Sequence, residues 1–339
     1  MEAGRPELFS VNFFHRKPHA VGNYSVEFIF DDVRSRLSEK INASKVYSPY
    51  ESAGLFKRFY NALHAAFHQG DVNHVTGDIN YIGIFLHKSR TIQTILDCVH
   101  METSSGLKHQ VLKFFWITLP VRRCRFVTAI SESTKREILK YAHCDPGKII
   151  VIPVAVSKRF KPKPRAFNKQ KPVLLQLGTA PNKNIPRLIE AVKDIPCILQ
   201  IVGKHNPQYE EMLKNYGIEY RYDWGLTDQQ ILEKYEQADM VTFTSTYEGF
   251  GMPILEGQSV GRPVITSKLL SMPEVAGDAA KLVDPYDPQD IRRGILQIIE
   301  QDQYREGLIA RGFENVKRYD PERIALMYYD LYAKTNKKP

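Results

Sequence analysis

Two glutamates, Glu248 and Glu256, lie eight positions apart in the second half of the chain. Gly249, Gly251 and Pro253 lie between them, which predicts a glycine-rich turn followed by a short helix that contains the second carboxylate. Such a turn lets backbone N–H groups approach a phosphate or a polar sugar, and Glu256, about one turn inside the helix, could accept hydrogen bonds from a ribose diol. The alternative is a charge that favours the helix dipole and a second, solvated glutamate.

The elements that must position these residues follow a simple alternation. Apolar runs alternate with helical patterns, which is typical of βα units around parallel sheets. We expect strands at 10–14, 44–47, 72–77, 91–97, 125–131, 149–156, 173–178, 197–203, 218–225, 240–246, 263–268 and 280–284. A basic, proline-containing stretch at 157–172 is predicted to be an interdomain linker. The sequence therefore predicts an α/β protein with two doubly wound domains and a cleft between them, with ligands at the carboxyl ends of the strands.

Composition limits the class of protein. The chain has 339 residues, of which 43% are hydrophobic and 25% charged, as in a soluble globular protein with two domains. No apolar run is long enough to span a bilayer, and the N-terminus has no secretory pattern. The four cysteines show no CxxC pair and no zinc spacing, which favours a reduced, cytoplasmic location.

Positive charge is concentrated in the first half. Residues 1–165 contain 25 Lys and Arg against 14 Asp and Glu, whereas residues 166–339 contain 22 against 24. This asymmetry suggests an anionic partner surface, and the alternative is a merely solubilising one. Residues 106–126 place Phe114, Phe115 and Trp116 among basic residues, which favours peripheral contact with the inner face of a membrane, although part of this stripe must also pack the core. Nucleic acid is not predicted as a partner, because no nucleic-acid-binding module is recognisable.

Residues 247–291, YEGFGMPILEGQSVGRPVITSKLLSMPEVAGDAAKLVDPYDPQDI, resemble the C-terminal half of retaining glycosyltransferases of family 4, which have the GT-B fold. The shared features are the spacing of the two glutamates, then G-x-P-V-I and PEV-x-GDAA. Further similar segments are LQLGTAPNKNIPRLIEAV (175–192), GLTDQQILEKYEQADMVTFTST (225–246), VTAISESTKREI (127–138) and KIIVIPVAV (148–156). The resemblance covers most of residues 70–330.

The resemblance implies two Rossmann-like domains facing across a cleft. Residues 1–160 would form the acceptor-binding domain, with the closing helix 321–335 packing back on it. Residues 166–320 would bind the nucleotide sugar. By the same resemblance Glu256 would bind the ribose, Glu248 would contact the donor sugar near the reacting carbon, and Lys183 would neutralise the diphosphate. The implied donor-binding residues are Gly22, Gly178, Thr179, Lys183, Gly203, Lys204, Leu226, Glu248, Gly249, Phe250, Gly251, Met252, Pro253 and Glu256.

The sequence departs from the family pattern at two positions. Asn182 stands where many relatives have an arginine close to the lysine, so Arg187 or Lys204 would have to supply a second cation. Leu96 stands where a histidine is common.

The first half offers its own candidates. Asp97 and His100 are predicted to act with Glu248 and Lys183 in catalysis. Candidate acceptor contacts are His74, Asp78 and Tyr81. The alternative for the histidines and aspartates is a satisfied turn or capping residue.

The implied reaction is transfer of a hexose from a nucleotide sugar to a glycan or lipid-linked acceptor, with retention and with the leaving phosphate helping to deprotonate the acceptor hydroxyl. No cofactor and no metal are expected, because the chain has no Asp-x-Asp motif and helix termini with a lysine would replace the metal.

Two rival functions are an inactive binding subunit and an NADP-dependent oxidoreductase. The segment 249–254 nearly matches a dinucleotide motif, but Ile254 replaces its third small residue and no acidic residue ends the next strand.

Overall fold

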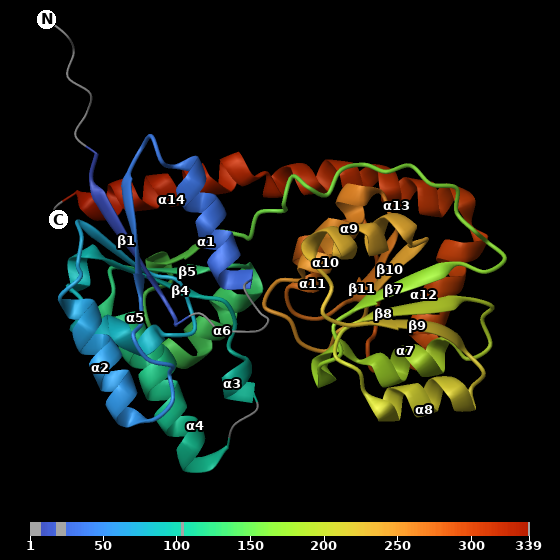
Figure 1. Cartoon of the computed structure of the whole chain (residues 1–339), viewed down its shortest axis with the longest axis horizontal. Helices are drawn as coiled ribbons and strands as arrows, with labels where there is room; N and C mark the ends of the chain where they lie inside the picture. Colours follow the sequence, from blue (N-terminus) through green and yellow to red (C-terminus); the bar gives the residue numbers. More distant parts are fainter. Residues whose placement is uncertain (1–7, 18–24, 103–104, 338–339) are drawn as a thin grey trace, which may run out of the picture. The chain divides into compact units, whose positions relative to one another are not determined.

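The computed structural model describes residues 8–17, 25–102 and 105–337. The chain forms two units (Figure 1). Unit 1 contains the described residues up to Ala155 together with the C-terminal segment from Pro321, and unit 2 spans Val156–Asp320.

Unit 1 is built on a six-stranded parallel sheet with the order β2-β1-β3-β4-β5-β6. Its strands are β1 (Ser10–His15), β2 (Asn42–Tyr47), β3 (Val72–Val75), β4 (Thr91–Ile95), β5 (Phe126–Ala129) and β6 (Ile149–Val151). The register pairs Val11 of β1 with Ala43 of β2 on one side and Val72 of β3 on the other. Each of the six predicted strands is present. The central strands β3 and β4 are buried along their whole length, as suits a parallel sheet, whereas the edge strand β2 is mostly exposed.

Helices cover this sheet. They are α1 (Ser25–Arg36), α2 (Leu55–Ala66), α3 (Val99–Glu102), α4 (Gly106–Leu112), the π-helix η3 (Lys113–Thr118), α5 (Leu119–Arg123), α6 (Glu132–Ala142) and α14 (Pro321–Asn336), with short 3₁₀ turns η1 (Asn80–Phe85), η2 (Lys88–Arg90) and η4 (Pro146–Lys148). The C-terminal α14 lies against α1 (Figure 1). Its buried Tyr328 and Tyr332 pack against Phe13 and Phe30, so the last helix of the chain completes the core of unit 1.

Unit 2 is built on a second six-stranded parallel sheet, with the order β12-β11-β10-β7-β8-β9. Its strands are β7 (Val173–Leu177), β8 (Ile198–Val202), β9 (Glu219–Asp223), β10 (Met240–Phe243), β11 (Val264–Ser267) and β12 (Lys281–Val283). Its helices are α7 (Ile185–Val192), α8 (Pro207–Asn215), α9 (Asp228–Gln237), α10 (Met252–Val260), α11 (Met272–Ala276), α12 (Pro288–Glu300) and α13 (Asp302–Asn315), with the 3₁₀ turns η5 (Pro181–Lys183) and η6 (Val316–Tyr319). The predicted α/β class with two doubly wound domains is confirmed.

The strand order of unit 2 reverses between β7 and β10. From β7 the chain proceeds outward through β8 and β9, and from β10 it proceeds in the opposite direction through β11 and β12. The two strands are neighbours, with Leu175 paired to Val241. In open α/β sheets the loops at such a switch point diverge and leave a crevice at the carboxyl ends of the strands, which is where ligands bind.

The stretch at 157–172 differs from the predicted linker. It contains no helix or strand, but it packs on unit 2. The buried Phe160 meets the edge of the Tyr235 ring at 5.4 Å between centroids. The backbone of Lys163 exchanges hydrogen bonds with Val260 and the Arg262 guanidinium. An aromatic contact and hydrogen bonds therefore attach to unit 2 a stretch whose composition predicted a linker.

Within the described ranges, every helix is too short or too polar to cross a bilayer.

Candidate functional site

The loop after β7 carries Lys183 to the switch point. Gly178 follows the strand with φ +82°, a left-handed conformation that favours glycine. A Cβ at Gly178 would lie 2.9 Å from Cε of Lys183, so the missing side chain makes room for the lysine to fold back over the strand end. The 3₁₀ turn η5 then ends at Asn184, whose amide bonds the backbone oxygens of Thr244 and Pro285 and fixes the start of α7.

Lys183 and Glu248 form an ion pair at the ends of β7 and β10. The Nζ–Oε1 distance is 2.5 Å, and the two side chains are 20% and 15% exposed. Asn182 donates from Nδ2 to the same carboxylate oxygen at 3.2 Å and to the backbone oxygen of Tyr247 at 2.9 Å. Asn182 therefore fastens the glutamate instead of supplying the cation that an arginine would bring. The structure joins a partly accessible cation and carboxylate, and an incoming anion could replace the carboxylate on the lysine.

One serine fixes the backbone of the loop that carries Glu248. The Ser271 Oγ lies 2.9 Å from the backbone oxygens of both Glu248 and Phe250, and its single proton is shared between these two acceptors. Gly251 has φ +112° and precedes α10, which begins at Met252 with Pro253 in its first turn, as predicted. This rigid turn presents the N-terminus of α10 beside the Lys183–Glu248 pair.

Glu256 belongs to a second network on α10. Tyr235 of α9 donates from its hydroxyl to Oε2 at 2.5 Å. Burial raises the pKa of Glu256, while the Tyr235 hydrogen bond and the positive charge of Arg159 act in the opposite direction. Burial first, and then the Glu256 charge, raise the pKa of Tyr235 well above its ordinary value, so the phenol stays protonated and remains a donor. The carboxylate is thus oriented before any ligand arrives.

Tyr235 and Arg159 are site residues that sequence reasoning missed. Arg159 forms an ion pair with Asp228, and its charge also acts on Glu256. It lies in the stretch predicted to be a linker, where nothing in the composition separates it from neighbouring basic residues. Tyr235 is a buried helix residue, and only its partner shows that it does more than fill the core.

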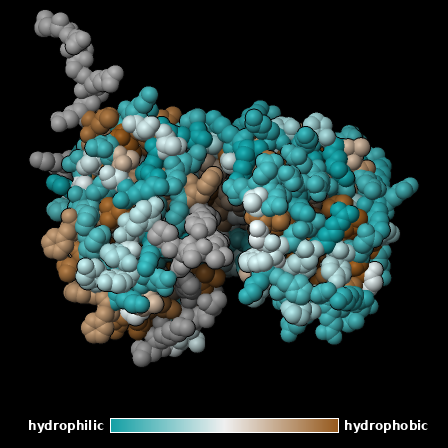
Figure 2. Space-filling view, in the orientation of Figure 1, coloured by the Kyte–Doolittle hydropathy of each residue, from teal (hydrophilic) through white to brown (hydrophobic). Residues whose placement is uncertain are grey.

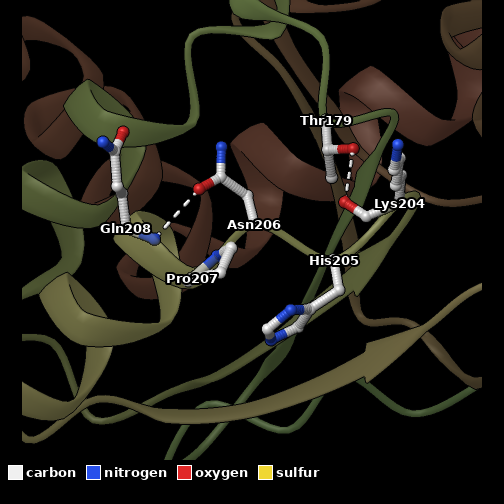
Figure 3. Close-up of a pocket in the computed structure, with 6 residues that line it drawn as sticks. All are labelled: Thr179, Lys204, His205, Asn206, Pro207 and Gln208. Carbon is white, nitrogen blue, oxygen red and sulfur yellow. Dashed lines mark hydrogen bonds between the residues drawn. The ribbon is translucent and has the colours of Figure 1, made fainter.

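The remaining donor candidates gather beside the same strand ends. Thr179, Lys204, His205, Asn206, Pro207 and Gln208 line an open cavity of about 610 Å³ (Figure 3). Thr179 donates to the backbone oxygen of Lys204 at 2.8 Å, and a Cβ at Gly203 would lie 2.7 Å from Cγ2 of Thr179. Thr179, Gly203 and Lys204 therefore lie together, whereas Leu226 is half-buried in the β9–α9 loop, and the role of these residues in donor binding stays a prediction.

The two cations weighed as substitutes for the missing arginine are placed differently. Arg187 donates to Asn184 and lies over the Tyr286 ring, while the side chain of Lys204 is exposed. Two buried hydroxyls at the end of β10, on Thr244 and Ser245, have no protein partner within the described part of the chain.

Unit 1 places its predicted residues differently. His74 is fully buried, with Nδ1 2.8 Å from the Tyr332 hydroxyl and Nε2 2.7 Å from Oγ1 of Thr94. Burial lowers the pKa of His74 to about 3. With both ring nitrogens engaged inside the core, this position argues against the predicted acceptor contact. Tyr81 is also buried, and its hydroxyl contacts Ser52 and Asn61.

The two aspartates of unit 1 that were predicted as site residues are exposed. Asp78 follows β3 in a left-handed conformation with φ 56° and pairs with Arg16 at 2.8 Å. Asp97 follows β4 and accepts from the backbone N–H of Val99 at 3.0 Å. Their predicted roles stay predictions. Gly22 and the side chain of His100 lie outside the described residues.

Comparison with known proteins identifies the domain that holds the ionic site. The family model for glycosyl transferases group 1 matches residues 157–315, nearly the whole of unit 2. Unit 2 is a group 1 glycosyl transferase domain. The motif set at the switch point of this glycosyl transferase domain, with Lys183, Glu248 and Glu256, therefore lies inside the segment that the family model describes.

Curated relatives are similar over part of their length. The O-antigen chain mannosyltransferase B of Escherichia coli is 29% identical over 61% of this chain and 60% of its own length. A serotype-specific mannosyltransferase, WbdA of Escherichia coli, is 29% identical over 58% of this chain and 27% of its own length. The matches thus span less than two thirds of these relatives.

Solved structures are similar over nearly the whole chain. Anabaena HepE, crystallised with UDP and glucose, has a TM-score of 0.76 at 16% identity, covering 96% of this chain and all of that one. WaaG, a glycosyltransferase of lipopolysaccharide biosynthesis, has a TM-score of 0.72 at 15% identity, covering 95% and 99%. At these identities the likeness concerns the fold, and the predicted GT-B fold is confirmed.

Proposed function

We propose that the protein is a retaining hexosyltransferase that moves a hexose from a nucleotide-diphosphate sugar to a hydroxyl of a glycan or lipid-linked glycan. The observation that carries the proposal is the Lys183–Glu248 pair at the switch point of the glycosyl transferase domain, with Glu256 oriented on the adjoining helix. A structural ion pair would need neither the glycine turn beside it nor a second, separately oriented carboxylate.

Each group has a task in this reaction. The Lys183 ammonium would exchange Glu248 for the diphosphate and stabilise the negative charge that develops as the glycosidic bond breaks. Glu248, released from the lysine but still held by Asn182, would contact the donor sugar. Glu256 would accept hydrogen bonds from the ribose hydroxyls, because Tyr235 already fixes its orientation. The cavity lined by Thr179 and Lys204 lies beside the same loops and would receive the base.

The acceptor step follows from the same arrangement. The leaving phosphate would take the acceptor proton on the face from which it departs, so the anomeric configuration is retained. Lys183 and the N-terminus of α10 would carry the charge that a divalent metal carries in other transferases. We therefore propose a metal-independent reaction.

Similarity to named relatives suggests which sugar, donor and acceptor the protein uses. Two relatives are named as mannosyltransferases, one of them of the O-antigen chain, which supports mannose as the hexose and a surface glycan as the acceptor. A structural neighbour was crystallised with UDP-glucose, which supports a nucleotide sugar as the donor. A lipid-linked acceptor would place the protein at the inner face of a membrane.

Thermal shifts with UDP, GDP, ADP and NADP, each with and without EDTA, test the donor assignment. A ligand at a hundred times its dissociation constant stabilises by about 2.7 kcal/mol, or several degrees in Tm. We expect a shift with one nucleoside diphosphate that EDTA leaves unchanged and that Glu256→Ala removes. A shift with NADP alone would overturn the proposal in favour of an oxidoreductase. Anomeric proton couplings of the sugar product then test retention.

A second candidate is an inactive subunit that binds the nucleotide sugar without turning it over. It is favoured by Asn182, which bonds Tyr247 and Glu248 at the position where relatives have an arginine. Nucleotide binding without product formation, restored to turnover by Asn182→Arg, would support this candidate.

A further inference from the structure

Helix α2 turns its apolar side outward. The stripe formed by Phe56, Phe59, Tyr60, Leu63 and the C-cap Phe67 lies on one face of the helix, because the spacings are three, four and seven residues. Phe56 is 91% exposed, Phe67 79% and Phe59 60%. Core-forming helices bury this face, so its exposure here needs an explanation.

The inner side of α2 shows why the helix is stable in this orientation. The residues that face the core are Asn61, Ala62 and Ala65. Asn61 bonds the backbone of Tyr50 in both directions and the Tyr81 hydroxyl at 3.0 Å. Two small side chains and a polar clamp therefore attach the helix, and its aromatic residues remain available for another surface.

Neighbouring elements extend this apolar face. Phe85 of η1 meets Phe59 edge-on at 5.8 Å between ring centroids. Arg58 of α2 lies 4.7 Å over the ring of Trp116 in η3, where the exposed Phe114 and Phe115 follow one another. In Figure 2 hydrophobic side chains gather at the lower left of the view, where Figure 1 places α2. We call the stripe on α2 together with Phe85 the aromatic face, because Arg58, which reaches Trp116, lies on the buried side of α2 away from the stripe.

The two stretches that form the aromatic face carry net positive charge. Residues 52–70 and 79–96 contain four Lys and Arg and no Asp or Glu, although Glu51, Asp71, Asp78 and Asp97 flank them. A symmetric dimer through this face would bring the same positive charges together. An anionic bilayer offers hydrocarbon for the aromatic side chains and phosphates for the basic ones at the same depth.

We propose that the aromatic face docks unit 1 onto an anionic lipid bilayer, with α2 lying in the interface. Sequence reasoning placed a membrane contact at 106–126, where Trp116 is half-buried against Tyr81 and Arg58. The most exposed apolar side chains belong to α2 instead. The proposal does not depend on the activity of the glycosyl transferase domain, because it concerns contacts of unit 1 alone.

Co-sedimentation of the full chain with large unilamellar vesicles tests it. The vesicles contain phosphatidylcholine alone or with about one third phosphatidylglycerol. We expect at least tenfold tighter binding to the anionic vesicles and weaker binding at high salt. Phe56→Asp should weaken vesicle binding at least tenfold. Lys57→Ala should weaken it about fivefold, because one basic side chain near an anionic surface changes the dissociation constant by about that factor. The matched control is Leu326→Asp, at a 47% exposed leucine of α14, which should bind like the wild type.

Other outcomes overturn the proposal. Equal binding to both vesicles, no binding to either, or wild-type binding by Phe56→Asp would each contradict it. Light scattering that shows a dimer dissolved by Phe56→Asp would assign the face to a second copy of the chain. Phe56→Asp should keep the wild-type Tm and its nucleotide thermal shift, so a failure here is distinguishable from a failure of the proposed activity.

Discussion

The two units share one architecture but differ in how accessible the ionisable residues of their central strands and strand ends are. Each has a six-stranded parallel sheet wound in both directions from an internal switch point. In unit 2 the strand ends bring Lys183 and Glu248 together in a partly accessible pair. In unit 1, His74 on the central strand β3 is fully buried in the core. A shared fold therefore does not determine which strand ends carry chemistry.

The difference has a physical origin in what each polar group is bonded to. Lys183 and Glu248 are satisfied by one another and could exchange that bond for a ligand at little net cost. His74 is satisfied by Tyr332 and Thr94, and Thr94 in turn contacts Thr128 at 2.6 Å. Opening this buried network would leave polar groups without partners, so it stabilises unit 1 instead of serving a substrate.

The largest effect is expected for Lys183→Ala. Removing the cation that stabilises the leaving diphosphate should lower kcat/KM by about 10²- to 10³-fold. Initial rates of nucleotide release measure this loss. Lys193→Ala, at the exposed lysine that caps the C-terminus of α7, is the matched control and should leave the rate unchanged. Wild-type turnover by Lys183→Ala would show that the ionic pair of unit 2 takes no part in the reaction.

Glu256→Gln should weaken nucleoside diphosphate binding about 10- to 100-fold, because a hydrogen bond to a charged group is worth roughly 1.5–3 kcal/mol. Isothermal titration calorimetry with the nucleotide found in the thermal-shift panel gives the change in Kd. The control is Glu233→Gln, an exposed glutamate on α9. Equal losses in the two variants would mean that Glu256 acts only through net charge.

Gly178→Ala should lower activity about tenfold and stability by about 1 kcal/mol, since alanine is strained at positive φ. Its Cβ would also displace Lys183, 2.9 Å away. Gly217→Ala is a matched control, because Gly217 has φ +65° and open space around it. It should lose similar stability and keep its activity. If both variants keep full activity, the glycine does not position the lysine.

The last prediction concerns stability instead of activity, namely a pH dependence that arises in the core of unit 1. Burial lowers the pKa of His74 to about 3, against an unfolded value of 6.5. The unfolded state therefore binds the proton first, and stability should fall as pH decreases from 6.5 towards 3, by at most about 1.4 kcal/mol per pH unit. Urea unfolding at several pH values should show a shallower slope for His74→Gln. The exposed His87→Gln should keep the wild-type slope, and a wild-type slope in His74→Gln would show that His74 is not the source.

The elements of both domains could be predicted from the sequence. All twelve strands lie where apolar runs occur, and α10 has Pro253 in its first turn and ends before Gly261, whose φ is +81°. These features depend on interactions within a few residues, namely side-chain periodicity and backbone preferences at glycine and proline. The spacing of Glu248 and Glu256 is local in the same sense, and together with the family resemblance it pointed to the candidate site.

Only the tertiary structure decided which partners those residues have. His74 is bonded to Tyr332, 258 residues away, and Glu256 to Tyr235 on another helix. The amphipathic pattern of α2 predicts a helix, but the side that it buries is set by Asn61 and two alanines, with Asn61 bonded to Tyr50 and Tyr81. Burial and pairing depend on segments distant in the chain, and a one-dimensional pattern does not contain those contacts. The local pattern thus determined where chemistry is possible, and long-range packing decided which side chains remain available for it.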